Sequence, residues 1–396
     1  MSDHVLSTSS TCAAARLPSA VYLIGLGAFA LGMASYVTAG LIPLIAPAFD
    51  VPVAMAAQLV TAFTLAYGLG SPPAVALLPA GRQRAGLLLA LAVFVLANGA
   101  SALAGSFAGL LALRAMAGIG SGVYLALGIA ACAAMVTPGQ RGKAIAAIMG
   151  GMASGTVLGV PLSLLLAERL GWASALWLVT ALGALALLGL CWKLPALPPA
   201  PAVALRRKLA LLADRQVMGI LSVSLLAAIA SLGMYTFIAP LVAPNGEAVA
   251  PFLWAWGVGG VAGSVLVGPL ADRLAAPRLT LAILLLLALS LAALPLAGAW
   301  QHWLPLLPIL LWGAAGWALQ VPQNQRLLAV RAGHGDDNLA IALNESALYL
   351  GSAIGAASGG LLLLLDWSAR TLGLGAAAVA AMAVLLQLAL WRRPGA

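Results

Sequence analysis

The sequence predicts an all-α membrane protein with twelve transmembrane helices in two pseudo-symmetric six-helix bundles. Of its 396 residues, 63% are hydrophobic and only 7% are charged, whereas soluble domains average about 25% charged residues. Apolar segments of membrane-spanning length fill most of the chain, and the two halves share motifs at a nearly constant offset. A chain this apolar cannot cover a water-facing surface, so we expect lipid to be its main solvent.

A helix needs about 20 apolar residues to cross the hydrocarbon core of a bilayer. The polar residues before Val21 could mimic the start of a signal peptide, but the many later spans favour a retained first helix. Windows of suitable length predict spans over residues 20–44, 55–78, 86–104, 108–134, 144–167, 173–192, 216–240, 250–270, 279–299, 305–328, 339–364 and 369–391.

The basic residues lie mostly in the loops on one side of this predicted membrane. With a cytoplasmic N-terminus, 16 of the 19 lysines and arginines are cytoplasmic, Arg169 and Arg370 are outside, and Arg114 lies within a span. This bias follows the positive-inside rule, so we expect both termini in the cytoplasm. It also accounts for the net charge of +9 without nucleic acid. The cytoplasmic set is Arg16, Arg82, Arg84, Arg141, Lys143, Lys193, Arg206, Arg207, Lys208, Arg215, Arg273, Arg278, Arg326, Arg331, Arg392 and Arg393.

The longest internal loop separates spans six and seven. It begins with a proline-rich stretch, Pro195 to Pro201, and continues over 205–212 as a basic amphipathic segment expected to lie on anionic headgroups. We therefore expect a cytoplasmic tail over 1–19, an N-terminal bundle over 20–192, a linker over 193–215, a C-terminal bundle over 216–391 and a second cytoplasmic tail over 392–396.

The two halves resemble each other in detail. The first span closes with Ile-Pro-Leu-Ile-Ala-Pro at 42–47, and the seventh closes with Ala-Pro-Leu-Val-Ala-Pro at 239–244. Shared Ala/Leu/Gly composition is the alternative explanation, but it does not readily produce matched proline pairs. Glycines recur at four-residue spacing in the fifth and eleventh spans, as Gly151, Gly155 and Gly159 and as Gly351, Gly355 and Gly359. Such small residues let helix backbones pack closely in membranes.

The loop after the eighth span carries a specific motif. It reads Gly-Ser-Val-Leu-Val-Gly-Pro-Leu-Ala-Asp-Arg over 263–273, with Arg278 following. This segment resembles the loop signature of the major facilitator superfamily. The resemblance implies that Gly268, Asp272, Arg273 and Arg278 form a latch that holds one conformation, with Asp272 paired to an arginine or accepting from a helix N-terminus. A solvated charge pair is the plainer alternative. The first-half loop, 79–84, keeps its arginines but lacks the acid.

The resemblance extends over about 21–391 and narrows to the twelve-span drug/proton antiporter branch. Within that branch the chain is most similar to bacterial sugar-efflux and arabinose-efflux-type permeases. Gly155, Gly159 and Pro161 resemble the motif of the exporting branch, where Pro161 removes one helix hydrogen bond. Related exporters often hold an acid in the first span, but here Ser35 occupies that position. A first-span carboxylate is therefore not expected to couple transport to protons.

Two charged residues are expected well inside spans. Arg114 in the fourth span matches a family feature and is expected to face the cavity and act in coupling or substrate binding, unless it only snorkels to the surface. Glu345 in the eleventh span lies eight residues beyond Asp337, about 12 Å along a helix. It is the candidate proton carrier as access alternates. The alternative is a glutamate that reaches back to the headgroups.

The resemblance implies a central cavity lined mainly by spans 1, 4, 7 and 10. Aromatic faces with scattered amides would suit a neutral or weakly amphipathic small molecule. The expected cavity residues are Tyr36, Tyr67, Arg114, Tyr124, Tyr235, Gln320, Asn324, Asn344 and Tyr349.

The leading functional prediction is a secondary transporter of the bacterial inner membrane that exports a small organic solute, such as a drug, sugar or metabolite, against proton entry. Uptake of a nucleoside, sugar or similar metabolite is the alternative. An intramembrane enzyme or scaffold is the alternative of another class, but Arg114 and Glu345 alone do not supply a catalytic cluster. We expect a monomer in the bilayer, with no cofactor, metal or nucleic acid; nothing resembles an ATP-binding loop.

Overall fold

A computed structural model describes residues 17–56, 58–79, 81–197, 210–242, 250–300, 303–365 and 367–391. Within these ranges the chain is helical and contains no strand. Most of the expected linker helix lies outside them, and the part that is described forms a short 3-10 helix, η4 (Ala210–Ala213). The basic residues Arg16, Arg206, Arg207, Lys208, Arg392 and Arg393 also lie outside the described residues.

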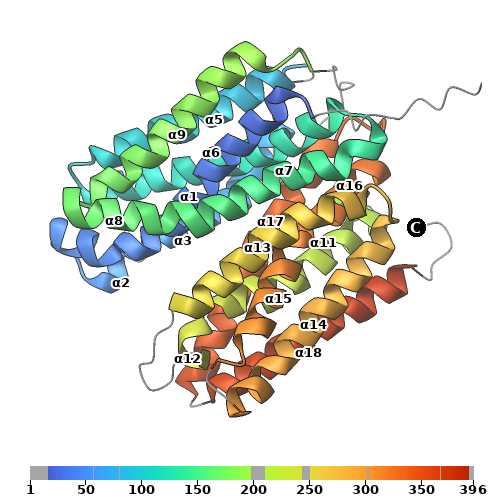
Figure 1. The fold of residues 1–396 in the computed structure, drawn as a ribbon. Helices are drawn as coiled ribbons and strands as arrows, with labels where there is room; N and C mark the ends of the chain where they lie inside the picture. Colours follow the sequence, from blue (N-terminus) through green and yellow to red (C-terminus); the bar gives the residue numbers. More distant parts are fainter. Residues whose placement is uncertain are drawn as a thin grey trace, which may run out of the picture.

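The described part of the N-terminal half forms six helical passages, which lie together on one side of the molecule (Figure 1). The second and fifth passages each contain a π-helical turn, η1 and η3, followed within two or three residues by a proline. Because proline lacks an amide donor, it favours such local irregularity. The passages are α1 (Ser19–Ala48); α2 (Val53–Ala56), α3 (Gln58–Leu65), η1 (Ala66–Gly70) and α4 (Ser71–Ala76); α5 (Gln83–Ala102); α6 (Phe107–Ala134); α7 (Arg141–Ser154), η3 (Gly155–Gly159) and α8 (Val160–Leu170) after the 3-10 turn η2 (Pro138–Gln140); and α9 (Trp172–Lys193).

The C-terminal half repeats this arrangement on the other side of the molecule (Figure 1). Eleven helices of the described chain are long and apolar enough to cross a membrane. The tenth passage is absent from that set because it is divided at Leu319. The passages are α11 (Arg215–Ala228) with the π-helical turn η5 (Ile229–Gly233) and α12 (Ile238–Val242); α13 (Ala250–Ala271); α14 (Ala276–Trp300); α15 (Leu306–Ala318) and α16 (Gln320–Val330); α17 (Asp337–Leu364); and α18 (Ala369–Trp391).

Glycines let the fifth and eleventh passages pack directly on the first and seventh. A Cβ atom at Gly155 would collide with the carbonyl of Phe29, and a Cβ at Gly355 would collide with the carbonyl of Ile229. The equivalent contacts are Gly151 with Gly25, Gly159 with Met33, Gly351 with Leu225, and Gly359 with Phe237. The two glycine series therefore make corresponding contacts in the two halves, which agrees with their pseudo-symmetry.

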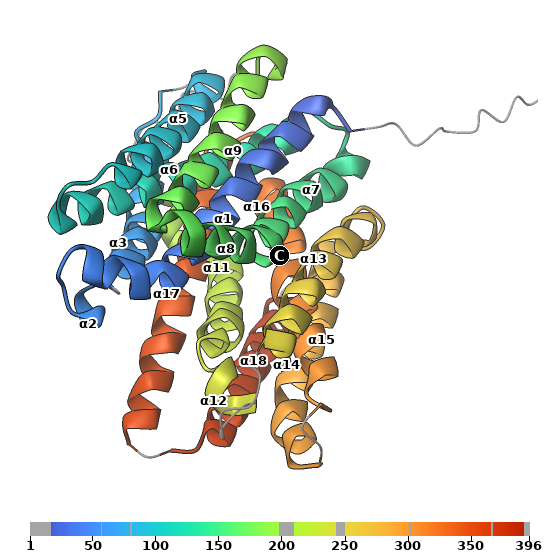
Figure 2. The same cartoon turned by 60° about the vertical axis from the view of Figure 1, so that its left-hand side comes forward.

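The two halves meet closely at one end of the molecule, where α7 begins and α13 ends. We call this the Asp272 end. A Cβ at Gly268 on α13 would lie against Ala146 and the main chain of Lys143 on α7. Near the middle of the molecule, the Ser346 hydroxyl on α17 donates to the Gly68 carbonyl on η1. In the turned view of Figure 2, α17 runs away from α2 and α3, toward the end of the molecule opposite the Asp272 end.

Candidate functional site

A polar cluster lies between the halves at the middle of α17. Glu345 is 1% exposed, and Tyr67 donates to its Oε2 through a long hydrogen bond of 3.5 Å. The Asn344 amide donates to Asn324 Oδ1 at 3.1 Å, and both asparagines are fully buried. The second carboxylate oxygen, Oε1 of Glu345, has no hydrogen-bond partner, and within the described chain Glu345 has no ion pair.

Tyrosines connect this cluster to its surroundings across the two halves. The rings of Tyr67 and Tyr349 lie 3.8 Å apart between centroids, at an interplanar angle of 30°. The Tyr349 hydroxyl is 3.4 Å from the Ser35 hydroxyl of α1. Tyr36 meets Tyr235 edge-on at 6.3 Å. These contacts join residues from the first, second, seventh and eleventh passages, so any separation of the halves must rearrange them.

Two cavities lie on opposite sides of these tyrosines. A small one of about 40 Å³ includes Glu345 and Gln320 in its wall, and it can hold a few water molecules. A larger one of about 620 Å³ lies toward the end opposite Asp272. Tyr36, Tyr349, Leu232 and Ser352 contribute to both walls. The tyrosine layer therefore separates the buried carboxyl group from the larger cavity.

The wall of the larger cavity is rich in hydroxyl groups, and none of the described residues that form it is charged. It is open, because Thr61, Leu65, Thr236 and Ala357 are exposed. Its volume falls in the range of small-molecule sites, roughly 300–1,000 Å³. The residues that line it are Ser35, Tyr36, Val60, Thr61, Thr64, Leu65, Leu232, Tyr235, Thr236, Tyr349, Ser352, Ala353, Ala356 and Ala357.

Arg114 and Tyr124 line neither of these cavities. The Arg114 guanidinium is 1% exposed, donates to Asn98 Oδ1 at 3.0 Å and to the Ala34 carbonyl at 2.8 Å, and lies over the Phe63 ring. It thus joins α6 to α5, α1 and α3 and does not extend to the membrane surface. The Tyr124 hydroxyl donates to the Ile24 carbonyl at 3.0 Å, a contact with α1.

Asp272 contacts the other half through the start of α7. Its carboxylate accepts from the main-chain amides of Gly142 at 2.6 Å and Lys143 at 3.2 Å. An acid at a helix N-terminus satisfies free amides and is favoured by the helix dipole. Burial raises the pKa of the Asp272 carboxyl, and the two amides and the Lys143 charge act in the opposite direction. Arg273 is exposed, and Arg278 lies over the Trp391 ring, so in the described chain neither pairs with Asp272.

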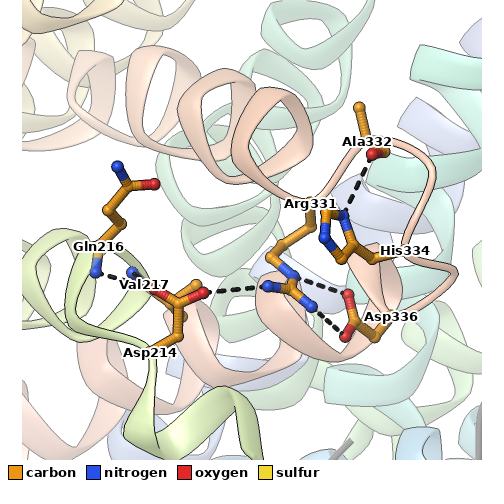
Figure 3. Close-up of polar contacts among 7 residues, drawn as sticks. All are labelled: Asp214, Gln216, Val217, Arg331, Ala332, His334 and Asp336. Carbon is orange, nitrogen blue, oxygen red and sulfur yellow. Dashed lines mark hydrogen bonds and ion pairs between the residues drawn. The ribbon is translucent and has the colours of Figure 1, made fainter. Parts of the chain in front are cut away.

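A second charged cluster lies wholly within the C-terminal half (Figure 3). Arg331, just after α16, bonds Asp336 through two nitrogens at 2.8 and 2.6 Å, and bonds Asp214 at 3.0 Å. Asp214 also caps α11 by accepting from the amides of Gln216 and Val217. The hydrogen bond to Asp336 raises the pKa of Arg331. This cluster fixes the ends of α11, α16 and α17 relative to one another.

Several residues of the site were not among the sequence-based candidates. The sequence singles out Ser35 only because related exporters often hold an acid at that position. In the structure its hydroxyl lies beside the hydroxyl of Tyr349. Thr61 and Thr64 enter the larger cavity from α3, and Ser352 enters from α17. The three-residue spacing of the two threonines placed them on one helical face. Tyr67, three residues beyond Thr64, was an expected cavity residue, but the two threonines themselves were not.

Two six-helix bundles that enclose a shared polar centre and an open cavity define a membrane transporter. The family model of the Major Facilitator Superfamily matches residues 24–336. The chain therefore belongs to the Major Facilitator Superfamily, and it is a multi-pass membrane protein.

The relatives agree with this assignment. The chain is 29% identical over 367 residues to the inner membrane transport protein YdhP of Escherichia coli K12, covering 92% of this chain and 93% of the relative. It is 31% identical over 279 residues to a chloramphenicol resistance protein of Streptomyces lividans, covering 68% and 71%.

Solved structures show the same fold. The proton:xylose symporter XylE aligns with a TM-score of 0.76 at 16% identity, covering 94% of this chain and 95% of that one. The human organic anion transporter MFSD10 aligns with a TM-score of 0.74 at 20% identity, covering 93% and 98%.

Proposed function

We propose that this protein is a proton-coupled antiporter that exports a small organic solute by alternating access. The observation that carries the proposal is Glu345, a buried acid between the halves that has no cationic partner among the described residues. An unpaired carboxylate at such a site is costly, so the neutral acid suits this closed environment. A group that is neutral when enclosed and ionised when hydrated can carry a proton between the two sides.

The conformation fits one stage of such a cycle. The halves are in contact at the Asp272 end, and the larger cavity lies toward the opposite end. The excess of arginine and lysine around Asp272 supports assigning that end to the cytoplasm of a bacterial inner membrane, with both termini there. In an antiport cycle this state follows solute release, when the carrier has taken up a proton from outside.

A route for that proton follows the tyrosine layer. Ser35 and Tyr349 line the larger cavity and lie within hydroxyl contact of each other. Tyr67 stacks on Tyr349 and donates to Glu345. We therefore assign Ser35, Tyr349 and Tyr67 as the hydroxyl path from the outer cavity to the carboxyl group. Asn324, beside the same carboxyl group, would position it.

Export is favoured over uptake by two observations. Gly155, Gly159 and Pro161 resemble the helix motif of exporting members, and Gly155 and Gly159 form the close contact of η3 with α1. The relative from Streptomyces lividans is named for chloramphenicol resistance, a phenotype that export of the drug would produce. Arg114 acts in this scheme as a positioning residue for α1 rather than as a substrate ligand.

The test is drug-driven proton movement in everted membrane vesicles. Protons accumulated inside the vesicles should leave when a transported solute is added, and Glu345→Gln should abolish this coupled flux, since an amide cannot carry the proton. Glu168→Gln is the matched control, because Glu168 is exposed at the end of α8 and its loss should leave coupling intact. Coupled flux that survives in Glu345→Gln would refute the proton assignment.

A further inference from the structure

The charge of the solute can be inferred from the wall of the larger cavity. Of the 14 described residues that line it, eight carry a hydroxyl group and none carries a charge or an amide. The remaining members are valine, leucine and alanine. Hydroxyl groups both donate and accept hydrogen bonds, so they satisfy polar groups of either kind. An ion would find no opposite charge there, and burying an unpaired charge is strongly unfavourable.

The buried carboxyl group of Glu345 does not change this balance in the observed conformation. Glu345 is absent from the wall of the larger cavity and lies behind the stacked rings of Tyr67 and Tyr349. An organic cation in the cavity therefore has no direct contact with the acid.

Tyrosine rings can also bind cations through their faces, which makes an aromatic cage the main competing explanation. Here one face of Tyr349 is covered by Tyr67, and one face of Tyr235 is covered by Trp256 at 4.3 Å between centroids. Tyr36 meets Tyr235 at an interplanar angle of 81°, an edge contact within the wall itself. The rings thus pack mainly against one another, and their hydroxyl groups remain the polar features of the wall.

We infer that the cavity selects uncharged organic solutes that combine hydrogen-bonding groups with an apolar part. The inference rests on the proposed function, because it assigns the larger cavity to the transported solute. It excludes organic cations, carboxylates and zwitterions as preferred cargo. The volume of about 620 Å³ leaves room for a drug-sized molecule.

The test is a binding screen on the purified full-length protein, read as thermal stabilisation. The panel contains equal numbers of uncharged, cationic and anionic organic compounds of matched size. Each uncharged binder is then compared with amine and carboxylate analogues of the same framework. We expect binders to be concentrated in the uncharged class and each ionised analogue to bind more than about tenfold more weakly.

A charge placed in the wall provides the second arm. Thr64→Asp introduces a carboxylate into the cavity, whereas Thr64→Asn changes the same side chain without adding charge. The Asp variant should gain affinity for organic cations and the Asn variant should not. If the Asp variant does not fold, the analogue comparison on the unaltered protein still decides the question.

Binding of ions as often as uncharged compounds would overturn the inference, as would the absence of any uncharged binder. Identical cation affinity in folded Asp and Asn variants would overturn the assignment of this cavity as the site. These outcomes are separate from the vesicle test. Selective binding of uncharged compounds combined with coupled flux in Glu345→Gln would leave the cavity inference intact and reject the proton assignment.

Discussion

Arg114 shows how a single buried residue can organise three helices. Its guanidinium donates to α5 through Asn98 and to α1 through the Ala34 carbonyl, and it covers the Phe63 ring of α3. An arginine within a span is costly unless it is bonded inside the protein. Here the acceptors are an amide and a main-chain carbonyl. The carbonyl belongs to the stretch of α1 that also carries Ser35 and Tyr36, so Arg114 affects the cavity indirectly.

Replacing Arg114 with lysine tests this role. Lysine keeps the positive charge but cannot reproduce the planar fork that reaches two acceptors. Loss of one such bond should cost about 1.5–3 kcal/mol, measured as a lower thermal midpoint of the purified protein. Arg82→Lys is the control, because Arg82 is exposed at the start of α5. Equal midpoints in both variants would contradict the positioning role.

At the scale of the helical elements, packing depends on which face a glycine occupies. Gly355 has no room for a side chain because Ile229 and Gly233 of η5 lie against it. Gly360, five residues along the same helix, has no atom close to the position of a Cβ. The two positions therefore form a matched pair within α17.

We expect Gly355→Leu to destabilise the protein and Gly360→Leu to leave it nearly unchanged. Overpacking a close helix contact typically costs about 1–3 kcal/mol, and a main-chain neighbour cannot move aside easily. The measurement is the amount of monodisperse protein and its thermal midpoint. Similar losses in both variants would mean that leucine is tolerated poorly anywhere on this helix.

The order and length of the helices could be predicted largely from hydropathy. The sixth span, expected over 173–192, forms α9 (Trp172–Lys193), and the fourth, expected over 108–134, forms α6 (Phe107–Ala134). The seventh was expected to continue to residue 240, but a turn at Thr236 and Phe237 interrupts it, so α12 is a separate short helix. The break in the tenth span was also missed. Pro322 is its signal, because a proline there cannot donate to the Ala318 carbonyl.

At the scale of the whole molecule, the contact of Asp272 with α7 links the two halves at one end. The Asp272 carboxylate accepts hydrogen bonds from two main-chain amides of α7. Gly268 has no side chain, so α13 and α7 come close enough for these hydrogen bonds to form. Hydrogen bonds to a charged group contribute about 1.5–3 kcal/mol. A contribution of that size shifts the balance between two conformations roughly 10- to 100-fold.

Asp272→Ala should therefore open the Asp272 end. Ala146 is buried against Gly268, so a cysteine placed there reports the change through its rate of maleimide labelling, in a chain whose native cysteines are replaced. Labelling should rise in Asp272→Ala and stay low in Arg273→Ala, because Arg273 is exposed. Equal labelling of both would show that the carboxylate does not hold this contact.

The candidate site could be predicted only in part from the sequence. Glu345 stood out because charged residues within apolar segments are rare, and Asp272 stood out because its loop resembles the signature of the superfamily. The sequence did not show which groups form hydrogen bonds with these two acids. Tyr67 and Tyr349 are far apart in the chain, and only the packing of α17 against η1 stacks their rings. Arg114 was expected in the cavity, whereas its hydrogen-bond acceptors hold it between α1 and α5.

The hydrogen-bond donors to the Asp272 carboxylate are main-chain amides, so these donor groups do not depend on which side chains α7 carries there. Lys143 contributes its main-chain N–H, which every residue except proline also has, and its own side chain is exposed. Gly142 contributes the same kind of donor, but a Cβ there would strike Asp272 and the Gly268 carbonyl. Any residue except proline at position 143 would keep this hydrogen bond, whereas a side chain at position 142 would displace the aspartate.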